Sequence, residues 1–286
     1  MRYRDFTPLP VIDAHVHVFP PKLFRAVKRW FETHAWRFHS DGTAEDFLEA
    51  QFEAGAAGLV LLSYAHRPEL SPSLNEFTAG LVKKFPNTVG LAAVHPGDPN
   101  PREVLYRAFE VGGLAGAKIH CHVLGVAPDD PALFPIYETL IGLEGVLVIH
   151  GGREPAIDAY GLDVRAITGA ARMARVLERY PELKVVVCHL GVDETEAFYA
   201  LLPRHPNLYL DTAMMLTGYL PVEISPERLE RHADRILFGT DYPHIPYAME
   251  TELKGLLDLN LSPAAARKIL HENARRLFFR DGPAGS

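Results

Sequence analysis

The chain has 286 residues and a formal net charge of −7 at pH 7. That length fits one or two domains, and an α/β barrel commonly uses about 250 residues as a single domain. The mildly acidic balance argues against nucleic acid or an anionic membrane as the main partner.

The sequence also lacks the marks of membrane insertion and secretion. No apolar run approaches the ~20 residues that span a bilayer, and the first residues contain no apolar core of a secretory signal. Cys121 and Cys188 are the only cysteines, and each lies in or beside an apolar run. We predict that both are small buried side chains without a chemical role. We therefore expect a cytoplasmic protein whose partner is a small-molecule substrate, with neither nucleic acid nor membrane as a partner.

Apolar, strand-like segments alternate with amphipathic segments along the chain. The strand candidates are rich in Val, Ile and Leu and nearly continuous in apolarity, as expected of strands buried on both faces of a parallel sheet. In chain order they are residues 11–17, 58–64, 89–94, 115–120, 146–150, 184–189, 208–211 and 235–238.

The segments between these strands have helical patterns, with apolar residues three and four positions apart. They are residues 44–54, 74–85, 102–111, 131–143, 164–180 and 194–202. Ser225 and Ser262 each precede a proline and predict helix starts. Eight strands followed by helical sequence predict an α/β fold, a (β/α)8 TIM barrel forming one domain over residues 1–286. A doubly wound open sheet is the alternative.

One segment interrupts this alternation. Residues 19–41 separate the first strand from the next helical pattern and are rich in aromatic residues, Trp30, Phe31, Trp36 and Phe38 among them. We predict an aromatic-rich loop insertion after strand 1. An insertion there lies at the catalytic face of a barrel, so we interpret it as a lid or pocket wall, with packing on the barrel rim as the alternative.

Residues with metal-ligating side chains close several of the predicted strands. They are His15 and His17, then His150, His189 and Asp241. His15 and His17 point the same way because a strand alternates its faces. In a barrel these strand ends share one mouth, whereas in an open sheet they could lie far apart. One such histidine could be a hydrogen-bonded core group, but burying the whole set unpaired would cost roughly 1–3 kcal/mol for each group. We therefore predict a metal site.

Six short motifs, in this order, resemble the amidohydrolase superfamily. More narrowly, they resemble its branch of metal-dependent hydrolases and decarboxylases with a TIM-barrel fold, and the resemblance covers almost the whole chain. The motifs are IDAHVH at 12–17, AKIH at 117–120, VIHGG at 148–152, CHLG at 188–191, GTDYPH at 239–244 and ENARRLF at 272–278.

The resemblance implies that His15, His17, His150 and Asp241 bind one divalent ion. Zn²⁺ suits imidazole and carboxylate ligands, with Mn²⁺, Fe²⁺ or Co²⁺ as alternatives. His189 is implied either as a further ligand or as the group that holds and deprotonates the attacking water, and Asp241 as a second acceptor of that proton. The resemblance also implies a homodimer.

Candidate substrate contacts follow from position. Arg153 lies on the loop after the fifth strand, where it could bind a carboxylate or form a surface ion pair. His120 and His244 reach the predicted mouth, and Trp36 lies in the aromatic insertion. Lys118 lies on the fourth strand, where some superfamily members bridge two ions; we expect one ion here, with Lys118 as a neighbouring charge or substrate contact.

Two residues are predicted to have supporting roles. Asp13 points to the face opposite the paired histidines and is expected to anchor the strand end. Asp211 ends the seventh strand and is expected to hydrogen-bond near the metal ligands.

These features predict a metal-dependent hydrolase of an amide, ester or lactone in a small polar, carboxylated substrate. The alternative is non-oxidative decarboxylation of an aromatic or enoic acid, which the aromatic insertion and Arg153 would suit. A ligand-binding barrel without catalysis is a distant third, because every ligand position is filled.

Overall fold

The computed structural model describes residues 2–153 and 158–279, and its strands match the predicted ones closely. Neighbouring strands pair in parallel, in the orders β1-β2-β3 and β4-β5-β6-β7-β8-β9. The strands are β1 (Ile12–His17), β2 (Gly58–Leu62), β3 (Thr88–Gly90), β4 (Ala92–Ala93), β5 (Gly116–His120), β6 (Val146–His150), β7 (Lys184–Val187), β8 (Leu208–Asp211) and β9 (Ile236–Leu237).

The predicted third strand is divided into β3 and β4 at Leu91, whose N–H donates to the Leu61 carbonyl at 2.9 Å. At the other end of the order, the Ala14 N–H donates to the Phe238 carbonyl at 2.9 Å, so β1 also contacts the chain just after β9. The eight predicted strands are therefore confirmed as a parallel α/β fold of the (β/α)8 barrel type.

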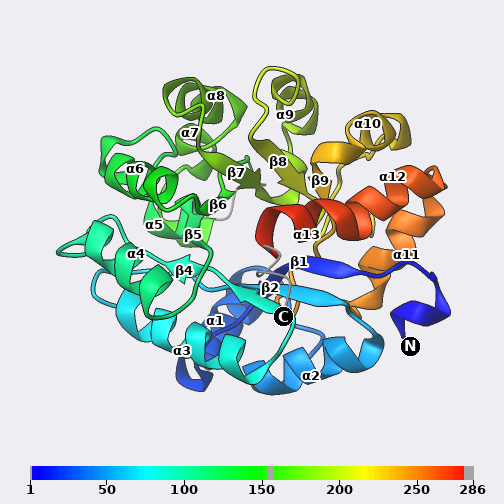
Figure 1. The fold of residues 1–286 in the computed structure, drawn as a ribbon, viewed down its shortest axis with the longest axis horizontal. Helices are drawn as coiled ribbons and strands as arrows, with labels where there is room; N and C mark the ends of the chain where they lie inside the picture. Colours follow the sequence, from blue (N-terminus) through cyan, green and yellow to red (C-terminus); the bar gives the residue numbers. More distant parts are fainter. Residues whose placement is uncertain (1, 154–157, 280–286) are drawn as a thin grey trace, which may run out of the picture.

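Helices surround the strands as an outer ring (Figure 1). None of the helices in the described part of the chain is long and apolar enough to cross a membrane. The helices are α1 (Pro21–His34), α2 (Ala44–Ala54), α3 (Ser71–Lys84), α4 (Pro101–Glu110), α5 (Cys121–Leu124), α6 (Phe134–Gly142), α7 (Val164–Ile167), α8 (Ala170–Arg179), α9 (Thr195–Leu201), α10 (Pro226–Arg231), α11 (Glu250–Asp258), α12 (Pro263–Arg267) and α13 (Asn273–Phe278).

The predicted caps are confirmed, and one predicted helix is divided. The hydroxyls of Ser225 and Ser262 accept backbone N–H groups at the starts of α10 and α12, both at 3.2 Å. The pattern at 164–180 forms α7 and α8, separated at Gly169, whose φ of +120° does not suit a helix interior. A Cβ on Gly169 would lie 2.4 Å from the Glu194 Oε2 atom, so the backbone approaches that carboxylate too closely for a side chain.

The aromatic insertion is not a loop: most of it is α1. Pro21 begins the helix, at a position where a backbone N–H would have no acceptor within the helix. Leu23, Val27 and Phe31 follow at intervals of four residues on one face. This four-residue period was the helical signal available in the sequence. The helix lies against the carboxyl ends of the strands, so the expected position at the mouth is correct although the expected conformation was wrong.

Side chains of alternate strand residues fill two cores. In β6, Val146 and Val148 pack inside the ring of strands, while Leu147 and Ile149 pack outward against the helices. Ala274 and Phe278 of α13 pack with the inner set. Among the described residues, side chains thus fill the interior of the ring of strands, as in other barrels of this type.

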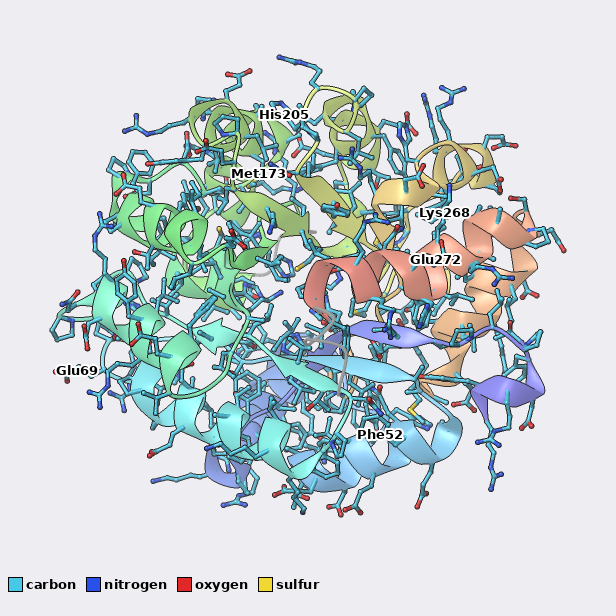
Figure 2. The ribbon with its side chains drawn as sticks, viewed as in Figure 1. Phe52, Glu69, Met173, His205, Lys268 and Glu272 are labelled. Atoms are coloured by element: carbon cyan, nitrogen blue, oxygen red, sulfur yellow. The ribbon has the colours of Figure 1, made fainter. Side chains whose placement is uncertain are left out.

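Side chains are drawn on the whole described ribbon in Figure 2. Among the buried ones, the carboxyl of Glu252 joins the chain after β8 to the chain after β9. Glu252 of α11 is fully buried; it accepts the Tyr247 hydroxyl at 2.5 Å and the Leu216 N–H at 3.2 Å. Burial raises the pKa of Glu252 from 4.5 to about 8, and the charges of Asp241 and Asp13 add to the rise. Between these two pH values the folded protein holds a proton that the unfolded chain has lost, so the free energy of unfolding falls as pH rises.

We therefore expect the stability of Glu252→Gln to depend less on pH than that of the native protein. Each unit of raised pKa corresponds to about 1.4 kcal/mol, so the native protein should lose stability relative to the variant between pH 5 and pH 9. Urea unfolding at both pH values measures this, with the exposed Glu49→Gln as the matched control. If the difference in free energy of unfolding between the native protein and Glu252→Gln is the same at both pH values, Glu252 does not have a raised pKa.

Candidate metal centre

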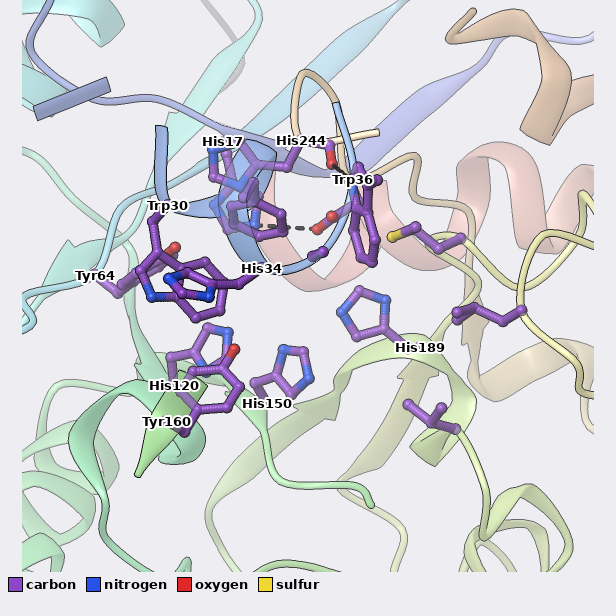
Figure 3. Close-up of a pocket in the computed structure, with 16 residues that line it drawn as sticks. His17, Trp30, His34, Trp36, Tyr64, His120, His150, Tyr160, His189 and His244 are labelled. Carbon is purple, nitrogen blue, oxygen red and sulfur yellow. Dashed lines mark hydrogen bonds and ion pairs between the residues drawn. The ribbon is translucent and has the colours of Figure 1, made fainter. Parts of the chain in front are cut away.

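A cavity of about 280 Å³ opens at the carboxyl ends of the strands, where the predicted ligands were expected to meet. Its described lining residues include six histidines, Asp241 and aromatic side chains of α1 and the segment after it. Figure 3 shows His17 and His244 at one end of this cavity and His189 apart from them across the space. The histidines are His17, His34, His120, His150, His189 and His244.

Three of the predicted ligands form a compact triangle. The Asp241 Oδ1 atom lies 3.0 Å from His15 Nε2 and 3.1 Å from His17 Nε2, and the two nitrogens are 3.2 Å apart. Ligand atoms about 2.1 Å from one ion are separated by about 3.0 Å at a right angle and about 3.4 Å at a tetrahedral angle. The edges of the triangle have these lengths, so the donor set and its spacing fit one divalent ion.

The local backbone helps to direct these side chains. The pairing of β1 with β2 shifts register between Asp13 and Val16, as at a β-bulge, and His15 lies within that irregular stretch. Asp13 accepts the Thr240 hydroxyl at 2.5 Å and the Thr240 N–H at 3.0 Å. This buried carboxylate therefore joins β1 to the residue before Asp241, the anchoring position expected for it.

Asp211 supports the triangle from behind. Its Oδ2 atom lies 2.9 Å from His15 Nδ1, and its Oδ1 atom accepts the His189 N–H at 2.8 Å. A carboxylate on the far nitrogen of a ligating histidine fixes the tautomer and leaves the other nitrogen for the ion. Asp211 is thus positioned to orient His15 and to hold the backbone of His189.

The ionisation of the triangle also suits a cation. Burial alone would lower the pKa of His15, but the Asp211 carboxylate raises it well above its usual value. Burial lowers the pKa of His17 to about 4, despite its hydrogen bond to Asp241. Burial would raise the pKa of Asp241, but the bonds from His15 and His17 hold it well below its ordinary range. The triangle therefore carries a carboxylate and a neutral His17 at neutral pH, whereas His15 is protonated there and would release its Nε2 proton on binding an ion.

His150 and His189 occupy different positions relative to this triangle. His150 lines the same cavity, with its ring stacked on His120 at 4.1 Å between centroids, but belongs to neither group of close ligand atoms in the described chain. His189 Nδ1 lies 2.8 Å from the Ala213 carbonyl oxygen. A carbonyl oxygen only accepts, so Nδ1 carries the proton and Nε2 is the basic nitrogen.

Several residues of the cavity wall have left-handed backbone conformations. His189, Val192, Met214 and Asp241 line the cavity with φ values of 57°, 52°, 61° and 67°. Such values are uncommon outside glycine and most unusual for a β-branched residue such as Val192. Strained conformations of this kind persist where the surrounding structure enforces them, and they cluster at functional sites.

Three of the five proposed substrate contacts lie in the cavity. His244 stacks on His17 with ring centroids 4.3 Å apart, and Trp36 Nε1 donates to the His244 carbonyl at 2.6 Å. His120 lies at the end of β5, buried against Tyr64. Within the described chain, His120 Nδ1 and His244 Nε2 are buried without a hydrogen-bond partner.

The other two do not line the cavity. Arg153 is 46% exposed in its side chain and pairs with Glu194, with Nε and Oε2 3.5 Å apart, so the structure shows the surface ion pair that was one of the two alternatives. Lys118 is fully buried, and its ammonium donates to Cys188 Sγ at 2.9 Å. It shares a strand face with His120 but lies deeper in the barrel, which places its charge below the cavity.

Cys188 is the residue that the sequence interpretation missed. It is buried as expected, but it accepts the Lys118 ammonium and forms a second group of close ligand atoms with His15 and His189. The position of Cys188 at the end of β7, beside His189, was the available signal. Both cysteines are buried as predicted, and Cys188 also lies among the candidate ligand atoms.

The parallel α/β barrel and the ligand set at its carboxyl end define a TIM-barrel protein with a candidate metal centre. A family model described as Amidohydrolase matches residues 12–280. The match covers most of the sequence, so the chain belongs to the amidohydrolase family of enzymes.

Solved structures with the same fold come from several bacteria. An uncharacterised TIM-barrel protein of Bordetella bronchiseptica is 23% identical, with a TM-score of 0.72 and coverage of 94% of this chain and 98% of that one. A 5-carboxyvanillate decarboxylase of Novosphingobium aromaticivorans, complexed with manganese, is 19% identical, with a TM-score of 0.69 and coverage of 95% and 96%.

A third structure is a probable 2-pyrone-4,6-dicarboxylic acid hydrolase of Acinetobacter baumannii. It is 17% identical, with a TM-score of 0.66 and coverage of 95% of this chain and 100% of that one. At these identities the likeness concerns the fold alone.

Proposed function

We propose that the protein is a metal-dependent hydrolase that cleaves an amide, ester or lactone bond of a small molecule. The observation that carries this proposal is the triangle of His15, His17 and Asp241, whose edges suit the ligands of one ion. We propose His150 as the fourth ligand and Zn²⁺ as the ion, with Mn²⁺, Fe²⁺ or Co²⁺ as alternatives. The manganese in the Novosphingobium decarboxylase supports a divalent ion at such a site.

A bound divalent ion would polarise the scissile carbonyl and make a water molecule more acidic. His189 supplies the proton acceptor, because its Nδ1 is held by the Ala213 carbonyl and its Nε2 carries the lone pair. Asp241 is the second acceptor, since its carboxylate stays ionised. After bond cleavage, the same imidazole returns the proton to the departing nitrogen or oxygen.

The described cavity wall offers hydrogen-bonding groups to a substrate but no Arg or Lys side chain, so the proposed ion would be the main positive charge there. None of the described lining residues is Arg or Lys, so a substrate carboxylate would find no fixed cationic side chain there. The buried nitrogens of His120 and His244 are placed to hydrogen-bond a polar substrate group instead. Binding of such a group would offset the free energy of leaving these nitrogens unpaired.

Decarboxylation of an aromatic acid is the second candidate. The cavity has aromatic walls, including Phe31, Trp36 and Tyr64, which suit a planar ring. The 5-carboxyvanillate decarboxylase in the comparison supports this chemistry for the fold. The proton that replaces CO₂ on the ring carbon would be taken up from solvent by His189 Nε2 and delivered to the ring.

Measurement of the metal content tests the metal centre, which the hydrolase and the decarboxylase proposals both require. We expect protein purified without added metal to contain about one divalent ion per chain, and chelation to abolish turnover and lower the melting temperature. Readdition of the ion should restore both properties. A metal-free protein that is folded and active would contradict the proposed centre.

A substrate panel separates the two reactions. Amides, esters and lactones are assayed for acid release, and aromatic carboxylic acids for CO₂ release, under the same metal loading. We expect acid release. CO₂ release alone would establish the second candidate instead.

We further propose that residues 1–286 form one domain and that the protein is cytoplasmic, as the sequence predicts. A homodimer is proposed on the basis of the family resemblance. Light scattering of the purified protein measures the oligomeric state, and a monomer would contradict the dimer.

A further inference from the structure

A second cavity of about 510 Å³ lies beside the first, and we call it the side cavity. Five residues line both cavities, so the two are adjacent and share a wall. Figure 3 shows the labelled members of this wall gathered on one side of the metal-site cavity, opposite His189. The five shared residues are Trp30, Phe31, Tyr64, His120 and Tyr160.

The side cavity has an apolar wall on α1. Leu23, Ala26, Val27, Trp30 and Phe31 line it, and their spacing of three and four residues places them on one helix face. An apolar helix face normally packs on a core. On α1 this face is incompletely covered: Leu23, Val27 and Phe31 are only partly buried, and the space in front of them is the side cavity.

The opposite wall is also uncharged. It includes Val123 and Leu124 of α5, and no Asp, Glu, Lys or Arg lines the side cavity among the described residues. Its polar groups are the imidazoles of His66, His120 and His122 and the hydroxyls of Tyr64 and Tyr160. An ionic group would find no counter-charge there, whereas an alkyl chain or an aromatic ring would bury apolar surface.

The volume sets the size of the occupant. A cavity of about 150 Å³ lined by apolar side chains accommodates benzene, and about 300 Å³ is the lower end of ordinary ligand pockets. The side cavity exceeds both values, so it has room for a ring with a linker or for a chain of several carbons.

We propose that the substrate has two parts: a reactive carbonyl end in the metal-site cavity, and an uncharged alkyl or aromatic group in the side cavity. This inference rests on the proposed hydrolase function, and it replaces a compact polar substrate with an extended, partly apolar one. The shared wall of Trp30, Tyr64 and His120 lies between the two parts. The α1 face then selects the substrate, while the triangle at the strand ends carries out the reaction.

A series of straight-chain hydroxamates from acetohydroxamate to octanohydroxamate tests this proposal with the metal-loaded protein. The hydroxamate group would bind the ion, and the alkyl chain would extend into the side cavity. We expect each added methylene to lower the Kd by about fourfold until the side cavity is filled. Titration calorimetry measures the Kd values. Affinity that does not change with chain length would overturn the proposal.

Variants show where the chain binds. Val27→Trp should remove most of the gain with chain length while leaving acetohydroxamate binding unchanged. Leu124→Trp fills the same space from the opposite wall, should the α1 variant fail to fold. Val111→Trp is the matched control, because Val111 is 75% exposed at the end of α4. If hydroxamate affinity rises with chain length in both Val27→Trp and Leu124→Trp as much as in the native protein, the proposal is also overturned.

A second arm does not depend on the metal. Octanol titrated into the metal-stripped protein should bind saturably, and Val27→Trp should abolish this binding. If acetohydroxamate fails to bind while octanol binds as expected, the metal-centre proposal is wrong and the side cavity stands. If acetohydroxamate binds and octanol does not, the side cavity is not a binding site.

Discussion

Asp241→Asn is expected to abolish turnover while leaving the fold intact. The Asp241 carboxylate contacts both His15 and His17, and the pKa of Asp241 is held well below its usual range. The amide has the same shape but no charge, so it weakens the ion site and removes a proton acceptor. We expect a loss of about 10³-fold or more in kcat/KM, the scale of a lost acid–base group. Steady-state kinetics and metal content of the same preparation measure both effects.

The control for this variant is Asp41→Asn, an exposed carboxylate that pairs with Lys28 on the surface. It should keep native turnover and native metal content. Circular dichroism of both variants shows whether the barrel is intact. Turnover retained in a folded Asp241→Asn protein would remove Asp241 from the proposed chemistry.

Asp211→Asn is expected to lower metal affinity by about 10- to 100-fold, the usual effect of losing a carboxylate behind a ligating histidine. The Asp211 carboxylate holds His15 Nδ1 at 2.9 Å and the backbone of His189 at 2.8 Å. Replacing it removes the charge that favours the Nδ1 proton and leaves Nε2 less basic. Competition with a chelator of known affinity measures the change.

Asp98→Asn is the matched control, because Asp98 is also a buried carboxylate but accepts hydrogen bonds from Ser71 and from the Glu69 backbone. It should lose stability without a specific loss of metal affinity. Equal losses of metal affinity in the two variants would show that the effect of Asp211 is general destabilisation.

Much of the barrel was predictable because buried parallel strands leave a simple pattern. The runs ending at His17, His150 and Asp211 were correct to within a residue, since continuous apolarity and a terminal polar group mark a strand that ends at a barrel mouth. The same logic placed His15, His17 and Asp241 together. The alternation of side chains along a strand sets which face of the sheet each one lies on, and its distance from the strand end sets its position along the barrel axis.

The remaining features were only partly predictable from the sequence. The loop predicted after strand 1 is mostly α1, whose four-residue apolar period was the available helical signal. His150 ends β6 and lines the cavity as predicted, and the stacking of its ring on His120 is visible only in the folded chain. Strand alternation gave Lys118 the right face, but its depth in the barrel, which decides its contact with Cys188, follows from the stagger of the strands.

The position of α1 in the chain has a consequence for how this enzyme could diversify. The helix is an insertion between β1 and α2, and its inner face lines both cavities without contributing a residue to the triangle. Substitutions at Leu23, Ala26 or Val27 can therefore change what fits without altering the groups that perform the reaction. Selection acting on one short helix can retune specificity independently of the catalytic strand ends, so members of a lineage could exchange substrates while keeping one chemistry.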